Sequence, residues 1–279
     1  MTGSVWKLPG YVIERQLGAG GSGQVWLAHE RSGGAAVAVK LLPAVDRDQL
    51  AAVRAEAAML SALEHPHLLH LREVVPCRQG LALVVDLAVG GSLASLLRSR
   101  RRLSPGEVVT AVAPIGAALA YAHNAGVVHG DVTPANLLFT EVGLPLLADL
   151  GVARLCGDDS PVSSTPAYVD PAVAAGGMPA PTSDVFMLGA LALHALTGDP
   201  PWSGESPDQV LAVAAAGDLG DVAARMDEAG VPEQVAEVVG RALELDGARR
   251  PTAAEFALDL RHAAEPVAVE LGAGRPDGG

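Results

Sequence analysis

Short apolar runs separated by turns follow one another in the first 88 residues, and residues 11–17 alternate loosely between apolar and polar positions. Such runs are typical of β-strands. One segment differs, because apolar residues recur every three or four positions between residues 48 and 63 and predict a helix. A small antiparallel sheet with one packed helix is therefore expected in this part of the chain. The expected strands cover residues 11–17, 24–29, 35–42, 68–75 and 81–87.

Beyond residue 90 the spacing of apolar positions changes to that of helices. Two helix starts are marked by their caps, since Ser104 precedes Pro105 and Thr252 stands three residues before Glu255. The second part of the chain is therefore expected to be mainly helical. The expected helices cover residues 92–100, 105–125, 182–197, 207–216, 232–245 and 252–264.

The two patterns together predict an α+β fold with two lobes, a small antiparallel sheet lobe with one helix and a larger helical lobe. We assign residues 11–88 to the first lobe and residues 89–264 to the second. Residues 265–279 are rich in Gly and Pro and are expected to form a disordered tail. A ligand is expected to bind in the cleft between the lobes, which are joined near residues 86–91.

A glycine-rich turn joins the first two expected strands and reads Gly18-Ala19-Gly20-Gly21-Ser22-Gly23-Gln24-Val25. Glycines let backbone N–H groups approach phosphate oxygens without interference from side chains. The spacing G-x-G-x-x-G-x-V is a weak signal by itself, because glycine-rich hairpins and dinucleotide sites give similar strings. Its place between two strands, instead of between a strand and a helix, argues against a dinucleotide site.

Lys40 ends the third expected strand, from which its ammonium can reach phosphates under the glycine-rich turn. Lysine is rare in this chain, since Lys7 is the only other one. Glu56 lies on the expected helix that follows, beside its apolar stripe. A Lys–Glu ion pair there would hold the ammonium in place.

Three further polar residues stand at the ends of short apolar runs. Asp131 and Asn136 share one turn, and Asp149 follows thirteen residues after Asn136. Asp131 is expected to accept or orient a hydroxyl proton. Asn136 and Asp149 offer oxygen ligands of the kind that Mg²⁺ prefers. Asp and Asn are common in turns, so this prediction depends on their occurrence in order with Lys40.

In this order the residues define a resemblance. Over about residues 11–264 the chain resembles the eukaryotic-like (Hanks-type) Ser/Thr protein kinases of bacteria, especially those of actinobacteria. The resemblance implies transfer of the ATP γ-phosphate to Ser or Thr hydroxyls of proteins. It implies catalytic roles for Asp131 as the base and for Lys40 and Asn136, with Mg²⁺ (or Mn²⁺) bound by Asn136 and Asp149. It implies nucleotide binding by Leu17, Gly18, Gly20, Gly23, Val25, Ala38, Lys40, Glu56, Val85, Asp86, Ala88, Leu138 and Asp149.

The chain departs from the family pattern at four places. Gly130 replaces an Arg that pairs with a phosphorylated activation loop, and Thr133 replaces a Lys that neutralises the γ-phosphate. Loss of that Lys is expected to cost a few kcal/mol of transition-state stabilisation, by analogy with oxyanion donors. Leu150 replaces the Phe of Asp-Phe-Gly, a change compatible with packing. Asp170-Pro171-Ala172 replaces Ala-Pro-Glu, which leaves Arg250 without its family partner unless Asp170 substitutes.

Two alternatives to a protein kinase stay open. An ATP-binding pseudokinase that acts as a signalling scaffold would need the same nucleotide-binding residues, because the departures affect catalysis more than binding. A small-molecule phosphotransferase is the third reading, since aminoglycoside kinases carry a string similar to His129-Gly130-Asp131. The run Thr165-Pro166-Ala167-Tyr168 resembles a peptide-positioning loop and argues against that reading.

Composition narrows the partner and the compartment. The net charge of −13 argues against nucleic acid or an anionic membrane as the main partner. The two cysteines, Cys77 and Cys156, form no disulfide framework and fit a reducing compartment. The first ten residues lack an apolar signal core, and no membrane span is expected. We therefore expect a cytoplasmic protein with a protein substrate or scaffold partner, and its oligomeric state is left open.

Overall fold

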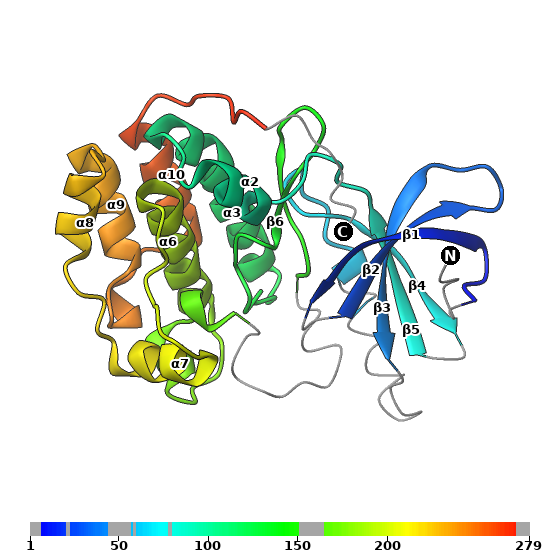
Figure 1. The fold of residues 1–279 in the computed structure, drawn as a ribbon, viewed down its shortest axis with the longest axis horizontal. Coiled ribbons are helices and arrows are strands. Elements are labelled where there is room, and N and C mark those ends of the chain that lie inside the picture. The colour runs from blue at the N-terminus through cyan, green and yellow to red at the C-terminus, as the bar shows by residue number, and fades with distance from the viewer. Residues whose placement is uncertain are drawn as a thin grey trace.

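The computed structural model describes residues 7–20, 23–43, 57, 60–77, 80–150 and 165–271. These residues form a sheet lobe and a helical lobe that lie side by side, with β6 near their junction (Figure 1). The two-lobed α+β prediction is therefore confirmed.

Five antiparallel strands make the sheet lobe, in the order β1-β2-β3-β5-β4. Side chains alternate between the two faces of a strand, and β5 shows the consequence. Leu81 and Leu83 join the large hydrophobic core, whereas Ala82 and Val84 join a smaller cluster on the other face. The strands are β1 (Tyr11–Gly20), β2 (Gly23–Glu30), β3 (Ala36–Pro43), β4 (Leu71–Cys77) and β5 (Gly80–Asp86), close to the predicted ranges.

The helix predicted at residues 48–63 lies largely outside the described residues, and Glu56 lies outside them altogether. Ala57, Leu60 and Leu63 are described, and all three are buried in the large core. Their burial agrees with the apolar spacing from which the helix was predicted.

The helical lobe is built around α6 (Pro181–Thr197), in which every residue from Ser183 to Leu193 is buried. The helices α3, α9 and α10 pack against it. The elements of this lobe are α2 (Leu93–Arg100), α3 (Pro105–Asn124), β6 (Leu137–Phe139), β7 (Pro145–Leu147), η1 (Pro166–Tyr168), α5 (Pro171–Ala174), α7 (Pro207–Ala216), α8 (Val222–Glu228), α9 (Glu233–Ala242), η2 (Gly247–Arg249) and α10 (Ala253–Ala263).

Within the part of the chain that the structure describes, α3 is the one helix long and apolar enough to cross a membrane by length and composition. The apolar stretch is 67% buried inside the protein, where α3 packs against α10 and α6. Its apolar character therefore matches its position in the core of the helical lobe.

Both predicted caps are present. The Ser104 hydroxyl accepts a hydrogen bond from the Glu107 amide, and the Glu107 carboxylate accepts one from the Ser104 amide. Thr252 and Glu255 make the same reciprocal pair at the start of α10. Each cap satisfies amides that have no partner inside the helix. By contrast, α8 was not predicted, because Met226 is its only buried residue and the apolar spacing is weak.

The sequence predicts a tail from residue 265 onward, and the structure describes residues 265–271 of it. This segment leaves α10 and runs over α3 and α2 toward the sheet lobe, as the red stretch of Figure 1 shows. It is fixed there by a hydrogen bond from the Val267 amide to the Gly106 carbonyl, 3.0 Å long. Val269 is buried in the large core.

Candidate active site

The turn that carries Asp131 is held by a buried carboxylate of α6. Asp184 has no exposed surface, and it accepts hydrogen bonds from the His129 amide at 2.8 Å and the Gly130 amide at 2.7 Å. The His123 imidazole, at the end of α3, binds the same carboxylate at 2.7 Å. The position of the turn is therefore fixed by the two central helices of the lobe.

His129 links this turn to the strand that precedes Asp149. Its Nδ1 accepts a hydrogen bond from the Asp131 amide at 3.1 Å, and its Nε2 donates to the Ala148 carbonyl at 2.9 Å. One ring therefore connects the backbone of both acidic residues. Because His129 is buried, any displacement of the ring would disturb both.

Asn136 and Asp131 contact each other directly. The Asn136 side-chain amide donates to the Asp131 carbonyl at 2.8 Å and to Asp131 Oδ2 at 2.9 Å. Asp131 Oδ1 is buried and has no hydrogen-bond partner among the described residues. A buried carboxylate oxygen without a partner is costly, and it is suited to accept a hydrogen bond from a substrate hydroxyl.

Lys40 of β3 reaches across the cleft to Asp149. Its ammonium lies 2.7 Å from Asp149 Oδ2, and the two side chains are 4% and 29% exposed, respectively. Asp149 has a φ angle of 61°, in the left-handed region that few non-glycine residues adopt. Such strain is often found at functional sites. The predicted Lys40–Glu56 pair lies outside the described residues and stays a prediction.

The cleft between the lobes has a volume of about 1190 Å³. Most of the predicted site residues line it, whereas Gly20, Gly23 and Asp131 are not among its lining residues. Gly23 instead approaches β3 closely, because a Cβ built on it would lie 2.8 Å from the Leu41 carbonyl oxygen. The predicted residues that line the cleft are Leu17, Gly18, Val25, Ala38, Lys40, Val85, Asp86, Ala88, Asn136, Leu138 and Asp149.

Asp86, at the junction of the lobes, has polar partners that its sequence context did not reveal. Its carboxylate accepts a hydrogen bond from Arg72 Nε at 2.6 Å, and its amide donates to the His70 carbonyl. The hydrogen bond between the Arg72 and Asp86 side chains is the main cause of the raised pKa of Arg72. The Asp86 carboxylate therefore ties the junction to β4.

Sequence reasoning also missed several residues that line the cleft. Among them are Arg15 of β1, Arg98 of α2 and Leu271 of the C-terminal segment. No local pattern marks them, since each reaches the cleft only through the packing of distant segments.

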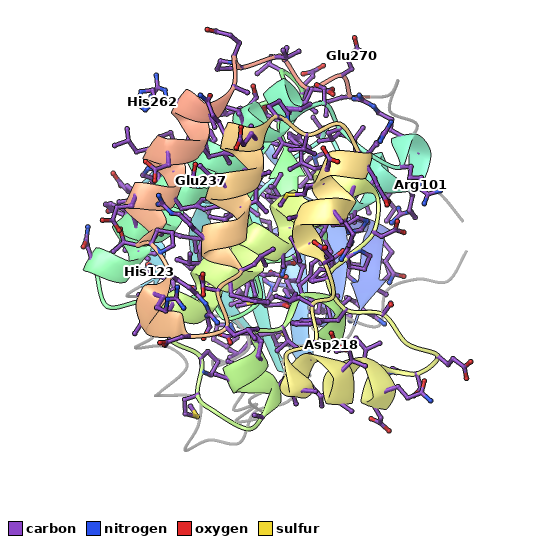
Figure 2. All side chains as sticks on the ribbon, turned by 90° about the vertical axis from the view of Figure 1, so that its left-hand side faces the viewer. Arg101, His123, Asp218, Glu237, His262 and Glu270 are labelled. Carbon is purple, nitrogen blue, oxygen red and sulfur yellow. The ribbon has the colours of Figure 1, made fainter. Side chains whose placement is uncertain are left out.

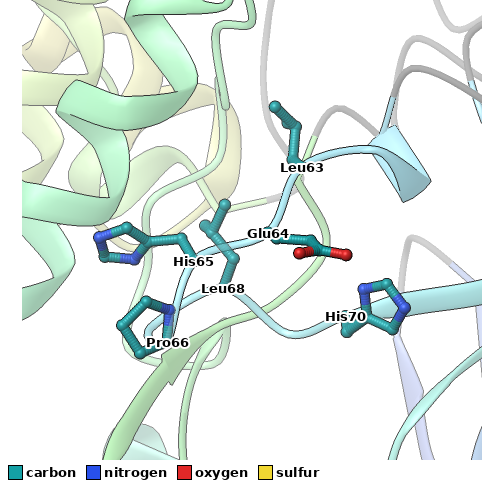
Figure 3. A pocket seen from close by; sticks show the side chains of 6 residues that line it. All are labelled: Leu63, Glu64, His65, Pro66, Leu68 and His70. Carbon is teal, nitrogen blue, oxygen red and sulfur yellow. The ribbon is translucent and has the colours of Figure 1, made fainter.

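A second pocket, of about 420 Å³, lies beside the cleft and shares Leu63 and Leu68 with it. Figure 3 shows the side chains that line it, including Glu64, His65 and His70. His65 Nδ1 accepts a hydrogen bond from a backbone amide. No group of three or more His, Cys, Asp or Glu that could hold a metal occurs among the described residues.

Arg250, which lacks the Glu partner of the family pattern, pairs with Asp170 instead. Arg250 Nη1 and Nη2 lie 2.7 Å and 3.3 Å from the two Asp170 oxygens, and both side chains are almost fully buried. The acid two positions before Ala172 therefore takes the partner role, as the sequence suggested.

The segment Pro166–Tyr168 forms the short helix η1 and is anchored to the helical lobe. The Tyr168 hydroxyl lies 2.6 Å from His194 Nδ1, and the two rings stack. Burial raises the pKa of Tyr168 and lowers that of His194. Trp202 Nε1 donates to the Val169 carbonyl at 2.8 Å. These contacts anchor the predicted peptide-positioning segment to α6 and to the segment that follows it.

Lys40 and Asp149 thus pair across the interlobe cleft, beside the turn that holds Asp131 and Asn136. The model of the family described as "Protein kinase domain" matches residues 11–259. The chain therefore belongs to the protein kinase domain family.

Named relatives agree with this assignment. The chain is 35% identical to "Serine/threonine-protein kinase PkaA" of Streptomyces coelicolor, over 93% of this chain and 51% of that protein. It is 32% identical to "Serine/threonine-protein kinase PknK" of Mycobacterium tuberculosis, over 95% of this chain and 25% of that protein. The crystal structure of Rad53 1-466 in complex with AMP-PNP is similar with a TM-score of 0.75 and 25% identity, over 89% of this chain and 64% of that one.

The predicted membership of the protein kinase family is thus confirmed, and the curated relatives that the chain matches are named Ser/Thr protein kinases. The chain spans about half the length, or less, of the curated relatives that it matches.

Proposed function

We propose that this chain transfers the γ-phosphate of ATP to Ser or Thr hydroxyls of proteins. The observation that supports this most directly is the buried Oδ1 of Asp131, which has no hydrogen-bond partner among the described residues. Asp131 is bound by Asn136, which lines the same cleft as Lys40 and Asp149. In this proposal the hydroxyl of the substrate donates to Oδ1, and the carboxylate takes its proton as the phosphate is transferred.

The cleft lining suits an adenine nucleotide. Leu17, Val25 and Ala38 line it from the sheet, and Leu138 lines it from β6. We propose that these apolar side chains enclose the base, which Val85, Asp86 and Ala88 border at the junction. The glycine-rich hairpin, with Gly18, Gly20 and Gly23, would lie over the phosphates. Lys40 would bind them as a fixed positive charge.

The oxygen donors of Asn136 and Asp149 fit Mg²⁺ or Mn²⁺. Asn136 donates to Asp131 through its side-chain nitrogen, which leaves its side-chain oxygen to bind the metal in this proposal. Lys40 binds Oδ2 of Asp149, and that carboxylate remains partly exposed to the cleft. A divalent ion held by these two residues would neutralise charge on the phosphates. We propose that Glu56 supports Lys40, as the family resemblance implies.

The two departures inside the catalytic turn change how it is held and charged. Gly130 has a φ angle of 77°, a conformation that glycine adopts without strain. Its amide is held by Asp184, so the turn does not depend on an Arg–phosphate contact. Thr133 is 1% exposed and brings no charge. We therefore propose a kinase that needs no activation-loop phosphate and transfers phosphate slowly, with Lys40 and the metal as its cations.

The alternative is a pseudokinase that binds ATP and presents a surface to a partner protein. It rests on the same two departures, Gly130 and Thr133, and not on any residue of the nucleotide cleft. We favour catalysis because Asp131, Asn136, Asp149 and Lys40 all occupy positions at the cleft or directly beside it. We place the reaction in the cytoplasm, acting in bacterial signalling.

The test is the transfer of label from [γ-³²P]ATP to the chain itself and to generic protein substrates. We expect wild-type protein to transfer label and Asp131→Asn to lose about a thousandfold in rate, as for removal of a group that acts in the transition state. Both proteins should be stabilised by ATP with Mg²⁺. Stabilisation without any transfer by the wild type would instead establish the pseudokinase. A Thr133→Lys variant that gains rate would show that the missing charge limits catalysis.

A further inference from the structure

The C-terminal strap, residues 264–271, makes three sets of contacts on its way from α10 to the cleft. In Figure 2, His262 near the end of α10 and Glu270 mark the start and the far end of this path. The first contact is at the beginning of α3. The Val267 amide donates to the Gly106 carbonyl, and a Cβ built on Gly106 would lie 2.5 Å from the Glu265 carbonyl oxygen. The strap and α3 therefore touch so closely that only glycine fits there.

The second contact is an ion pair with two hydrogen bonds to the strap backbone. Arg100 of α2 binds both oxygens of Glu107, at 2.6 Å and 2.9 Å. The Glu270 amide donates to Glu107 Oε1 at 3.2 Å, and the Glu270 carbonyl accepts from Arg100 Nη1 at 3.1 Å. Both members of the ion pair thus bind the backbone of one residue of the strap, Glu270. This geometry fixes the strap next to the C-terminal end of α2.

The third contact is apolar and reaches the cleft. Val269 is 8% exposed and lies in the large core, and the Val269 carbonyl lies near Gly143 in the β6–β7 turn. Leu271 packs against the same core and lines the interlobe cleft. Ser99 of α2 and Glu141 of the β6–β7 turn line the cleft as well. The strap is therefore both part of the helical lobe and part of the cleft wall.

We propose that the C-terminal strap is a wall of the nucleotide site, in which Leu271 contacts the adenosine part of the bound nucleotide. The inference rests on the proposed use of the cleft for ATP. The phosphates are assigned to Lys40 and the glycine-rich hairpin, so the end of the cleft that is lined by α2 belongs to adenosine. Docking of the strap and binding of nucleotide then stabilise each other, because linkage is reciprocal.

This role differs from a structural one, and the two are separable by residue. Val269 is buried in the core and does not line the cleft, so Val269→Ala should lower the melting temperature more than the affinity for nucleotide. Leu271 is only partly buried, so Leu271→Ala should do the reverse. A matched control is Leu258→Ala on α10, which removes the same atoms from a side chain that is 57% exposed.

The experiment measures the affinity of the full chain for ADP and ATP by calorimetry. We expect Leu271→Ala to weaken both nucleotides by about fivefold, from the loss of a partly buried apolar contact. The factor should be equal for the two, because the contact is to adenosine and not to phosphate. Gly106→Ala does not touch the cleft and should weaken both nucleotides too, because it dislodges the strap. Leu258→Ala should bind as the wild type.

A second readout follows the strap itself by amide hydrogen exchange. Saturating ADP should slow exchange at Val267 and Glu270, whose amides bind Gly106 and Glu107. Unchanged affinity in Leu271→Ala together with unchanged exchange would overturn the proposal while nucleotide binding by the wild type stands. A wild type that binds no nucleotide would overturn this proposal and the proposed function together. Binding without phosphate transfer would overturn only the transferase step.

Discussion

Two ion pairs, one across the cleft and one inside the helical lobe, show how differently this fold uses the same chemistry. Arg250 and Asp170 are 1% and 2% exposed, whereas Asp149 in the Lys40–Asp149 pair is 29% exposed. The cleft pair joins residues 109 positions apart in sequence and lies on the cleft wall. The core pair joins the segment before α5 to the segment before α10.

The core pair is saturated. The Arg250 guanidinium makes five hydrogen bonds, two to Asp170 and one each to the carbonyls of Glu244, Thr182 and Leu245. These use all five of its N–H groups, and the guanidinium also lies 4.9 Å from the centre of the Phe186 ring. No capacity is left for a ligand. The Lys40–Asp149 pair is partly open to solvent, so its carboxylate can accept a further ligand. We infer that this open pair serves function and that the closed pair, Arg250–Asp170, serves stability.

The largest expected effect is on the closed pair. Arg250→Ala leaves Asp170 charged and buried without its partner, and we expect a loss of about 4 kcal/mol in the free energy of unfolding. Urea denaturation of the purified protein measures this loss. Arg249→Ala is the control, because its side chain is 68% exposed and its contact with Glu244 is 3.6 Å long. A loss below about 1 kcal/mol in Arg250→Ala, near that of the control, would show that the closed pair is not needed for stability.

The open pair should respond in the opposite way. Lys40→Met removes the charge that we propose binds the phosphates, and we expect phosphate transfer to fall at least about a hundredfold. The Asp149 carboxylate can be solvated from the cleft, so the free energy of unfolding should change by less than about 1 kcal/mol. Transfer assays and urea denaturation on the same preparation measure both. Lys7→Met, at an exposed position, should change neither. A large loss of stability with transfer intact would contradict the distinction.

The pair formed by Arg100 and Glu107 is intermediate, with side chains 30% and 4% exposed. Burial raises the pKa of Glu107, but hydrogen bonds from Arg100, Ser104 and Glu270 outweigh it and lower the pKa from 4.5 to about 2. A lowered pKa means that the unfolded chain binds the proton more readily. The stabilisation is therefore complete above pH 4.5 and lost as the pH falls toward 2.

We expect Glu107→Gln to lose about 2 kcal/mol at pH 7, from a broken charge-assisted contact. The difference from the wild type should shrink as the pH falls from 4.5 toward 2. Urea denaturation at a series of pH values measures it, with Glu237→Gln, at an exposed position marked in Figure 2, as the control. A difference that is constant with pH would mean that the charge of Glu107 contributes nothing.

The smallest expected effect separates backbone strain from the function of the catalytic turn. Gly130 and Gly126 both have a φ of 77°, and a Cβ would fit at either position. Alanine at each should cost about 1 kcal/mol in the free energy of unfolding, from left-handed strain. Only Gly130→Ala should also slow phosphate transfer, because Gly130 borders Asp131. Equal transfer rates in the two variants, measured with radiolabelled ATP, would show that the turn tolerates strain.

The sequence predicted those parts of the molecule that are local or that occur in a fixed order. Short apolar runs bounded by turns placed the five strands. In β5 the run is continuous from Leu81 to Val84, because this strand buries side chains on both faces. Ser104 and Thr252 marked helix starts, because a cap lies within three residues of its partner. The order of Lys40, Asp131, Asn136 and Asp149 predicted residues that the fold brings to or beside one cleft.

Other contacts could not be read from the sequence, because their partners are distant and follow no period. Arg72 on β4 binds Asp86 on the neighbouring strand β5. Leu271, the last described residue of the chain, lines the cleft. The strap was assigned to a disordered tail, since Gly and Pro dominate the composition beyond residue 269. Its placement depends on Gly106 and on the Arg100–Glu107 pair, more than 150 residues earlier, as the 163-residue separation of Glu107 and Glu270 shows.

The most direct test of the distinction between the open and the closed pair is thermal unfolding with and without ATP and Mg²⁺. The proteins are the wild type, Lys40→Met and Arg250→Lys, in which the milder substitution keeps the charge. We predict that Lys40→Met melts near the wild-type temperature and loses the rise caused by ATP. We predict that Arg250→Lys melts at a lower temperature and keeps that rise. The opposite assignment, with the rise lost in Arg250→Lys and kept in Lys40→Met, would contradict the account.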